Sequence, residues 1–175
     1  RENYAHMRLH RILFILLMGS AAFSACRESI QLGANDCREG ECRYEILEDQ
    51  EIRIRSDRGD FSYTILDQSD QLLFRYVYNK DDNPMIADDE YTEWLFFEID
   101  PQATSFFFED SAMTDAKFLF QPFCECMDGL TLIVDGTLEG KKLNDNRWEV
   151  KMDVQFPWGS GMEAREIEAV FEVTE

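Results

Sequence analysis

Histidine is scarce in this chain, and its two histidines, His6 and His10, both lie within the first ten residues. An exported chain that loses this stretch retains no imidazole at all. Ser-His-Asp and Cys-His nucleophile pairs, imidazole zinc sites and histidine pH switches are then unavailable to the folded domain. The absence excludes much familiar hydrolase and metalloenzyme chemistry.

Long apolar runs are also scarce, and the clearest one belongs to an N-terminal leader. A basic segment at residues 7–11 (MRLHR) precedes the apolar run at residues 12–18 (ILFILLM), and small residues follow at 19–25. A basic segment, a short apolar run and a small-residue cleavage site are the parts of a secretory signal peptide. A membrane-spanning helix needs about 20 apolar residues, so this leader is too short to be a comfortable anchor.

The end of the leader, Phe23-Ser24-Ala25-Cys26, resembles the lipobox of bacterial lipoproteins. The resemblance implies cleavage before Cys26, a diacylglycerol thioether on its sulfur and a further acyl chain on its amine. More than one acyl chain makes anchoring stable. We therefore expect a lipid-anchored protein of the cell envelope, on the periplasmic or surface face of the outer membrane.

Three segments follow from this reading. Residues 1–25 are the removed leader, in which residues 1–6 are expected to be an upstream extension before the start at Met7. Residues 26–36 are polar, contain a glycine and show no period, which is typical of a tether. Residues 37–175 have the length of one domain with a real core.

Basic residues are few, since the chain has 17 Lys and Arg against 36 Asp and Glu. Loss of Arg1, Arg8, Arg11 and Glu2 with the leader leaves 14 basic and 35 acidic residues, a net charge of −21. Nucleic acids and anionic membrane surfaces both reward Lys and Arg. No nucleic-acid partner is expected, and the membrane is a partner only through the lipid on Cys26.

Helical periodicity is missing, whereas period-two alternation is strong. Apolar residues at even positions from 148 to 158 alternate with polar residues at odd positions from 147 to 155, as in a half-buried strand. Residues 130–138 and 167–173 behave alike, and turn-forming segments at 144–146 and 157–162 connect the three strands into a meander. Further strands are expected near residues 43–48, 51–56, 60–67, 71–79, 91–100, 104–109 and 116–121.

This pattern predicts an all-β fold, an antiparallel β-sandwich of about 8–10 strands. The alternative is an up-and-down, lipocalin-like β-barrel. The sandwich is preferred because the strands differ in length and the longest loops interrupt the meander.

Four cysteines remain after Cys26, namely Cys37, Cys42, Cys124 and Cys126. An even number in an exported chain favours disulfides over a metal-thiolate site or a redox-active dithiol. Two cysteines two positions apart on a strand share a face, so a bond between Cys124 and Cys126 would be strained. We therefore expect both to bond the N-terminal pair, closing loops of roughly 80–90 residues and adding about 4–5 kcal/mol each.

One loop, at residues 79–90, gathers five carboxylates: Asp81, Asp82, Asp88, Asp89 and Glu90. Carboxylate oxygens are the ligands that calcium prefers, and calcium is the one cofactor that the sequence suggests. The loop lacks the spacing of a recognised calcium motif, so a solvated acidic loop is the simpler interpretation.

Aromatic residues are abundant, and most of them fit a phenylalanine-rich core. Tyr91 and Phe97 share one face of their expected strand, while Trp94 and Phe96 share the other. Exposed aromatic rings can stack on sugars or pack against a protein. Trp94, Trp158 and Tyr91 are therefore the candidate ligand contacts.

Two functions from different classes remain at this point. The first is a non-catalytic binding or structural domain for an envelope protein or a glycan. The alternative is a carboxylate-based polysaccharide hydrolase, but among 35 acidic residues some pair at roughly 5–9 Å arises by chance. We prefer the first, because no catalytic motif is present.

Overall fold

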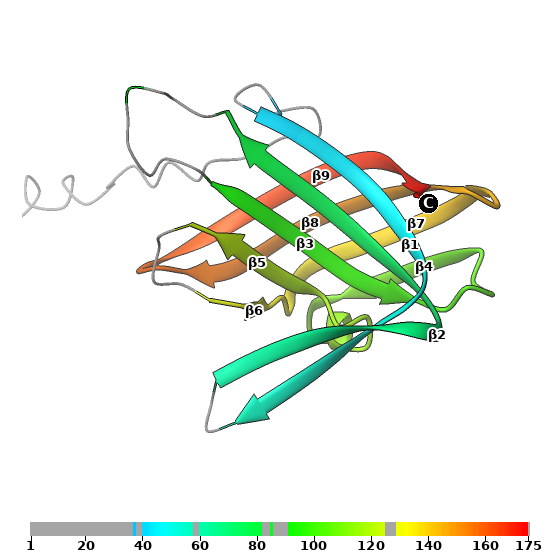
Figure 1. Cartoon of the computed structure of the whole chain (residues 1–175), viewed down its shortest axis with the longest axis horizontal. Coiled ribbons are helices and arrows are strands. Elements are labelled where there is room, and N and C mark those ends of the chain that lie inside the picture. Colours follow the sequence, from blue (N-terminus) through cyan, green and yellow to red (C-terminus); the bar gives the residue numbers. More distant parts are fainter. Residues whose placement is uncertain are drawn as a thin grey trace, which may run out of the picture.

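The computed structural model describes residues 37, 40–57, 60–81, 85, 91–124 and 129–174. The described residues contain nine strands and one short 3-10 helix, η1 (Figure 1). Among them no helix has the length and apolar character needed to cross a membrane. The elements are β1 (Gly40–Asp57), β2 (Asp60–Lys80), β3 (Thr92–Ile99), β4 (Ser105–Glu109), η1 (Asp110–Thr114), β5 (Leu119–Phe123), β6 (Thr131–Leu132), β7 (Asp135–Asn144), β8 (Arg147–Trp158) and β9 (Gly161–Val173).

The nine strands form one sheet in the order β4-β7-β8-β9-β1-β2-β3-β5-β6. All neighbours are antiparallel except β1 and β9, which pair in parallel over only two residue pairs. The sheet folds at this junction, so that β4, β7, β8 and β9 form one layer and β1, β2, β3, β5 and β6 the other (Figure 1). The order ends at β4 and β6, and the sheet is not closed. The predicted all-β sandwich is confirmed, and the barrel alternative is wrong.

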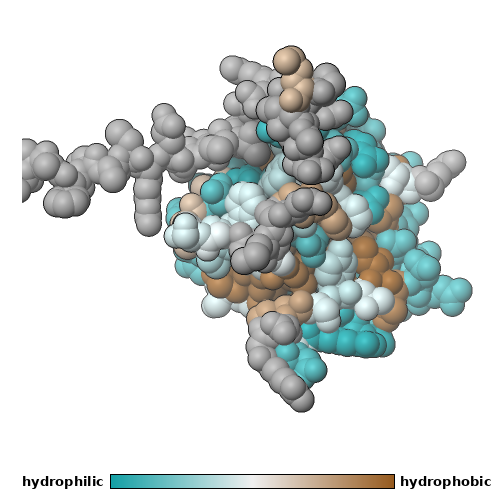
Figure 2. All heavy atoms as spheres, turned by 60° about the vertical axis from the view of Figure 1, so that its left-hand side comes forward, coloured by the Kyte–Doolittle hydropathy of each residue, from teal (hydrophilic) through white to brown (hydrophobic). Residues whose placement is uncertain are grey.

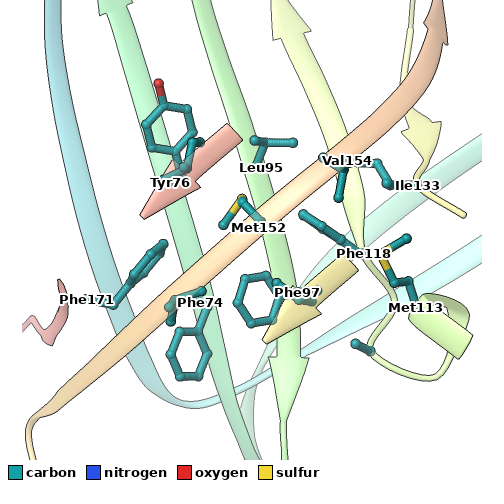
Figure 3. Packing of buried hydrophobic residues seen from close by; sticks show 14 of the residues in the cluster. Phe74, Tyr76, Leu95, Phe97, Met113, Phe118, Ile133, Met152, Val154 and Phe171 are labelled. Carbon is teal, nitrogen blue, oxygen red and sulfur yellow. The ribbon is translucent and has the colours of Figure 1, made fainter. Parts of the chain in front are cut away.

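The core lies between the two layers and is built by strict alternation. Along β8 every second residue from Trp148 to Phe156 is buried, as the sequence pattern predicts. These residues meet aromatic side chains of the facing layer, where Phe74 stacks on Phe97 with 4.9 Å between ring centroids (Figure 3). Each large apolar side chain buried here contributes about 1.5–3 kcal/mol.

The N-terminal strands are longer than expected. The strands expected at 43–48 and 51–56 are one 18-residue strand, β1, and those at 60–67 and 71–79 are one 21-residue strand, β2. The polar segments between them are a β-bulge, where the register shifts between Glu48 and Gln50. Asp49 and Gln68 adopt positive φ there, a conformation that aspartate tolerates better than most residues. Strand β2 therefore runs through the gap that was expected between residues 67 and 71.

Beyond the bulge the hairpin crosses the outer face of its own layer, and we call residues 50–67 the hairpin arm (Figure 1). Ile52 of the arm is fully buried against Leu73, Phe96 and Leu119, in a cluster separate from the main core. The carboxylate of Glu98 accepts the Ile52 N–H, while the Lys117 ammonium bonds the Ile52 carbonyl and pairs with Glu98 at 2.8 Å. These contacts occupy the main-chain N–H and C=O groups of Ile52, which are not used in the pairing of β1 with β2.

The disulfides differ from the predicted connectivity. Cys37 bonds Cys42, five residues away, so the expected long loops to the second pair do not form. Cys124 is also disulfide-bonded, while Cys126 lies outside the described residues. A local bond closes a loop of about five residues, for which chain entropy gives about 2 kcal/mol instead of the expected 4–5. The bond fixes the first residues of the domain to the start of β1.

Candidate functional site

The three predicted contact residues divide between the sandwich interior and the outer face of the layer that contains β3. Trp94 points from β3 to the outer face, whereas Tyr91 lies toward the sandwich interior, where its ring is 6.0 Å from that of Trp158. The structure thus brings Tyr91 and Trp158 together and separates Trp94 from both. The expected division of the aromatic residues between the two faces of this strand is confirmed.

On the outer face Trp94 belongs to what we call the outer aromatic surface, defined by Tyr63, Arg75, Trp94 and Phe123. The ring of Trp94 lies 4.7 Å from that of Phe123, which is 41% exposed at the end of β5. The guanidinium of Arg75 lies over the Trp94 ring at 5.1 Å. Tyr63 of the hairpin arm joins the surface beside Phe96, with 4.7 Å between the two ring centroids. Figure 2 shows apolar areas between hydrophilic ones on the side of the molecule that lies on the left in Figure 1.

Arg75 is held in place by a carboxylate on the neighbouring strand. The carboxylate of Glu45, opposite Arg75 in β1, accepts hydrogen bonds from the Arg75 guanidinium at 2.7 and 2.8 Å. The same carboxylate lies 3.4 Å from Arg43. Burial raises the pKa of Tyr63, and the positive charge of Arg75 partly opposes that increase. The Trp94 indole N–H is buried and has no hydrogen-bond partner among the described residues. The surface therefore combines fixed aromatic rings with one oriented cation.

The interior group is a buried ion pair between the two layers. Arg165 of β9 is 4% exposed and donates two hydrogen bonds, at 2.9 and 2.7 Å, to the carboxylate of Glu93 on β3, which is fully buried. The hydroxyl of Tyr91 donates to the same carboxylate at 2.7 Å. Arg165 also donates to Glu163 and to the Ala164 carbonyl.

The chemistry of this interior group is that of a fixed charge. Burial alone would lower the pKa of Arg165, but its hydrogen bonds to Glu93 and the charge of Glu93 outweigh burial and raise it. Burial, followed by the negative charge of Glu93, raises the pKa of Tyr91 and of Tyr76. All three groups keep their protons at neutral pH within this cluster. It joins the two layers.

Neither Arg165 nor Glu93 was identified from the sequence, although alternation could have found both. Arg165 has the parity of the inward residues Ile167 and Phe171, and Glu93 has the parity of Leu95. A charged residue at an inward position signals a buried partner, because lone buried charges are too costly. Their pairing across 72 residues has no local signal.

The predicted calcium loop lies mostly outside the described residues, which include Asp81 but not Asp82, Asp88, Asp89 or Glu90. Within the part of the chain that the structure describes, no group of three or more metal-ligating side chains is arranged to hold an ion. Calcium binding by this loop stays a prediction.

Glu98 is the described carboxyl group with a raised pKa, caused by burial and opposed by Lys117. Its hydrogen-bond and ion-pair partners are the Ile52 N–H and Lys117, and the negative charge of Glu51 adds to the increase in its pKa. A shallow depression of about 640 Å³ over β4, β7 and β8 is lined by residues of both charges, including Glu139, Lys141 and Lys151.

Searches of protein-family models, curated proteins and solved structures find no match to this chain.

Proposed function

We propose that this chain is a lipid-anchored protein of the bacterial cell envelope whose sandwich binds a protein partner, without catalysis, through the outer aromatic surface. The anchor is supported by the leader and by Phe23-Ser24-Ala25-Cys26. The single observation that carries the binding role is the grouping of Tyr63, Arg75, Trp94 and Phe123 on one outer sheet face.

A protein partner fits this surface better than a glycan. Trp, Tyr and Arg are the residue types that dominate binding energy at protein interfaces. Arg75 covers one face of the Trp94 ring, which removes that face from stacking on a sugar. A partner with a basic surface would also be attracted by the net charge of −21 that remains after removal of the leader.

The anchor is tested by replacing Cys26 with alanine in the native cell. The wild-type chain should fractionate with membranes, and its intact mass should show cleavage before residue 26 and added acyl chains. Cys26→Ala should carry no lipid and leave the anchored fraction. A wild-type chain of uncleaved, unacylated mass would contradict the anchor.

The binding role is tested with a photo-crosslinking amino acid placed at Phe123 in the full chain, in the native envelope. The control position is Leu143, which is similarly exposed, at 48% against 41%, but lies at the end of β7. We expect a protein adduct from position 123 and none from position 143. Arg75→Met should lower the affinity about 30-fold, as for an interface residue contributing about 2 kcal/mol.

Three outcomes would contradict the proposal: equal adducts at both positions, no adduct at position 123, or an adduct degraded by glycosidases but not by proteases. The last would assign the surface to a glycan. Circular dichroism of Arg75→Met checks that the variant is folded.

A further inference from the structure

Strand β4 (Ser105–Glu109) ends the sheet and has β7 as its described neighbour. The Lys142 N–H donates to the Thr104 carbonyl at 2.9 Å. Because hydrogen-bonded and non-hydrogen-bonded pairs alternate in an antiparallel ladder, Phe106 and Phe108 also direct their main-chain groups to β7. Ser105, Phe107 and Glu109 therefore direct their N–H and C=O groups away from it.

This outward edge lacks several of the features that usually protect a sheet edge, although the strand is only five residues long. The strand reads Ser-Phe-Phe-Phe-Glu, with no lysine, no proline and no register shift against β7. Phe106 and Phe108 pack toward the core, but Phe107 is 60% exposed on the outer face. An unprotected edge with an exposed aromatic side chain is suited to accept another strand.

We propose that β4 pairs antiparallel with β4 of a second copy of this chain, centred on Phe107. This register sets each outward-directed residue opposite another: Phe107 opposite Phe107 of the second copy, and Ser105 opposite its Glu109. A shift by one residue would set outward-directed groups against inward-directed ones. The central register thus forms three hydrogen-bonded residue pairs.

The side chains of β4 favour a second copy as the occupant. The two Phe107 rings form a cross-strand aromatic pair on the outer face, and each Glu109 lies opposite a serine instead of a like charge. The pairing is short, and the net charge of −19 on each chain opposes it, so added salt should strengthen it. Confinement to one membrane would raise the effective concentration of one copy of the chain around another. This part of the argument alone rests on the proposed anchor.

The test uses cysteine crosslinking of the full chain with a mild oxidant, both in the native envelope and purified in detergent. Phe107→Cys should give a covalent dimer, because paired residues on neighbouring strands lie about 5.5 Å apart, within disulfide reach. The control is Glu139→Cys, which is exposed, outward and directly opposite Phe107 on β7. In the paired dimer the two 139 positions are three strand spacings apart, about 14 Å, and should not crosslink.

A second substitution separates edge pairing from chance collision. In the Phe107→Cys background, Ser105→Pro removes an outward N–H that β7 does not use, and should lower the dimer yield at least severalfold without unfolding the domain. Ser105→Ala should leave the yield unchanged. Equal dimer yields from positions 107 and 139, or no loss with Ser105→Pro in a folded variant, would overturn the proposal. Dimers in detergent but not in the envelope would retain the pairing and count against the proposed anchor.

Discussion

Arg165→Met is expected to lower the free energy of unfolding by about 3–5 kcal/mol, because it leaves the carboxylate of Glu93 buried without its charged partner. Glu93 is fully buried and accepts two of its hydrogen bonds from Arg165. Only the Tyr91 hydroxyl would remain among its described partners. Denaturant unfolding of the two proteins measures the difference.

Two control variants test whether the loss of stability comes from the unpaired buried charge. Arg147→Met removes an ion pair of the same chemistry, at 2.9 Å from Glu172, but both side chains are about half exposed, so the cost should stay below about 1 kcal/mol. The double variant Arg165→Met/Glu93→Leu should recover much of the lost stability, because no buried charge is left. If Arg165→Met and Arg147→Met cost the same, the interior ion pair does not stabilise the sandwich.

Alternation predicted the parts of the fold that depend on local pattern. The β8-β9 hairpin follows from residues 147–173, whose strands alternate between buried and solvated positions. The strand expected at 130–138 is wrong, because Leu132 belongs to β6, which pairs with β5, and the strand before β8 is β7 (Asp135–Asn144). The opposite orientations of Trp94 and Tyr91 follow in the same way. These features need only neighbouring residues.

The remaining errors involve main-chain geometry or distant contacts. Polar segments around Asp49 and Gln68 resemble turns, but the strands continue through them by a bulge. The disulfide prediction considered strain between Cys124 and Cys126 and overlooked the short closure between Cys37 and Cys42. The outer aromatic surface needs Arg75 from β2 and Phe123 from β5, which no local pattern places together.

The stability of the fold should also fall steeply in alkali, because burial raises the pKa of Tyr76 in the folded chain. Its side chain is 3% exposed, and burial, followed by the charge of Glu93, raises its pKa from the ordinary value of 10.0. Since the pKa is higher in the folded chain, this contribution to stability is fully present below pH 10 and is lost as pH rises toward the folded-state value. Each pH unit above about 10 should cost roughly 1.4 kcal/mol for this residue, and Tyr91 acts in the same direction.

Tyr76→Phe isolates this effect, because among the described residues the hydrogen-bond partner of the Tyr76 hydroxyl is the Cys42 sulfur, at 3.5 Å. The variant should unfold much like the wild type at neutral pH but lose stability less steeply above about pH 10. Tyr63→Phe is the matched control: Tyr63 is half-buried and Arg75 opposes its pKa increase, so the alkaline slope should change less. The slopes come from denaturant unfolding at several alkaline pH values, with tyrosinate absorbance reporting ionisation. Identical slopes for wild type and Tyr76→Phe would mean that this hydroxyl ionises in the folded state, and that the core around Glu93 and Arg165 admits water and a second negative charge.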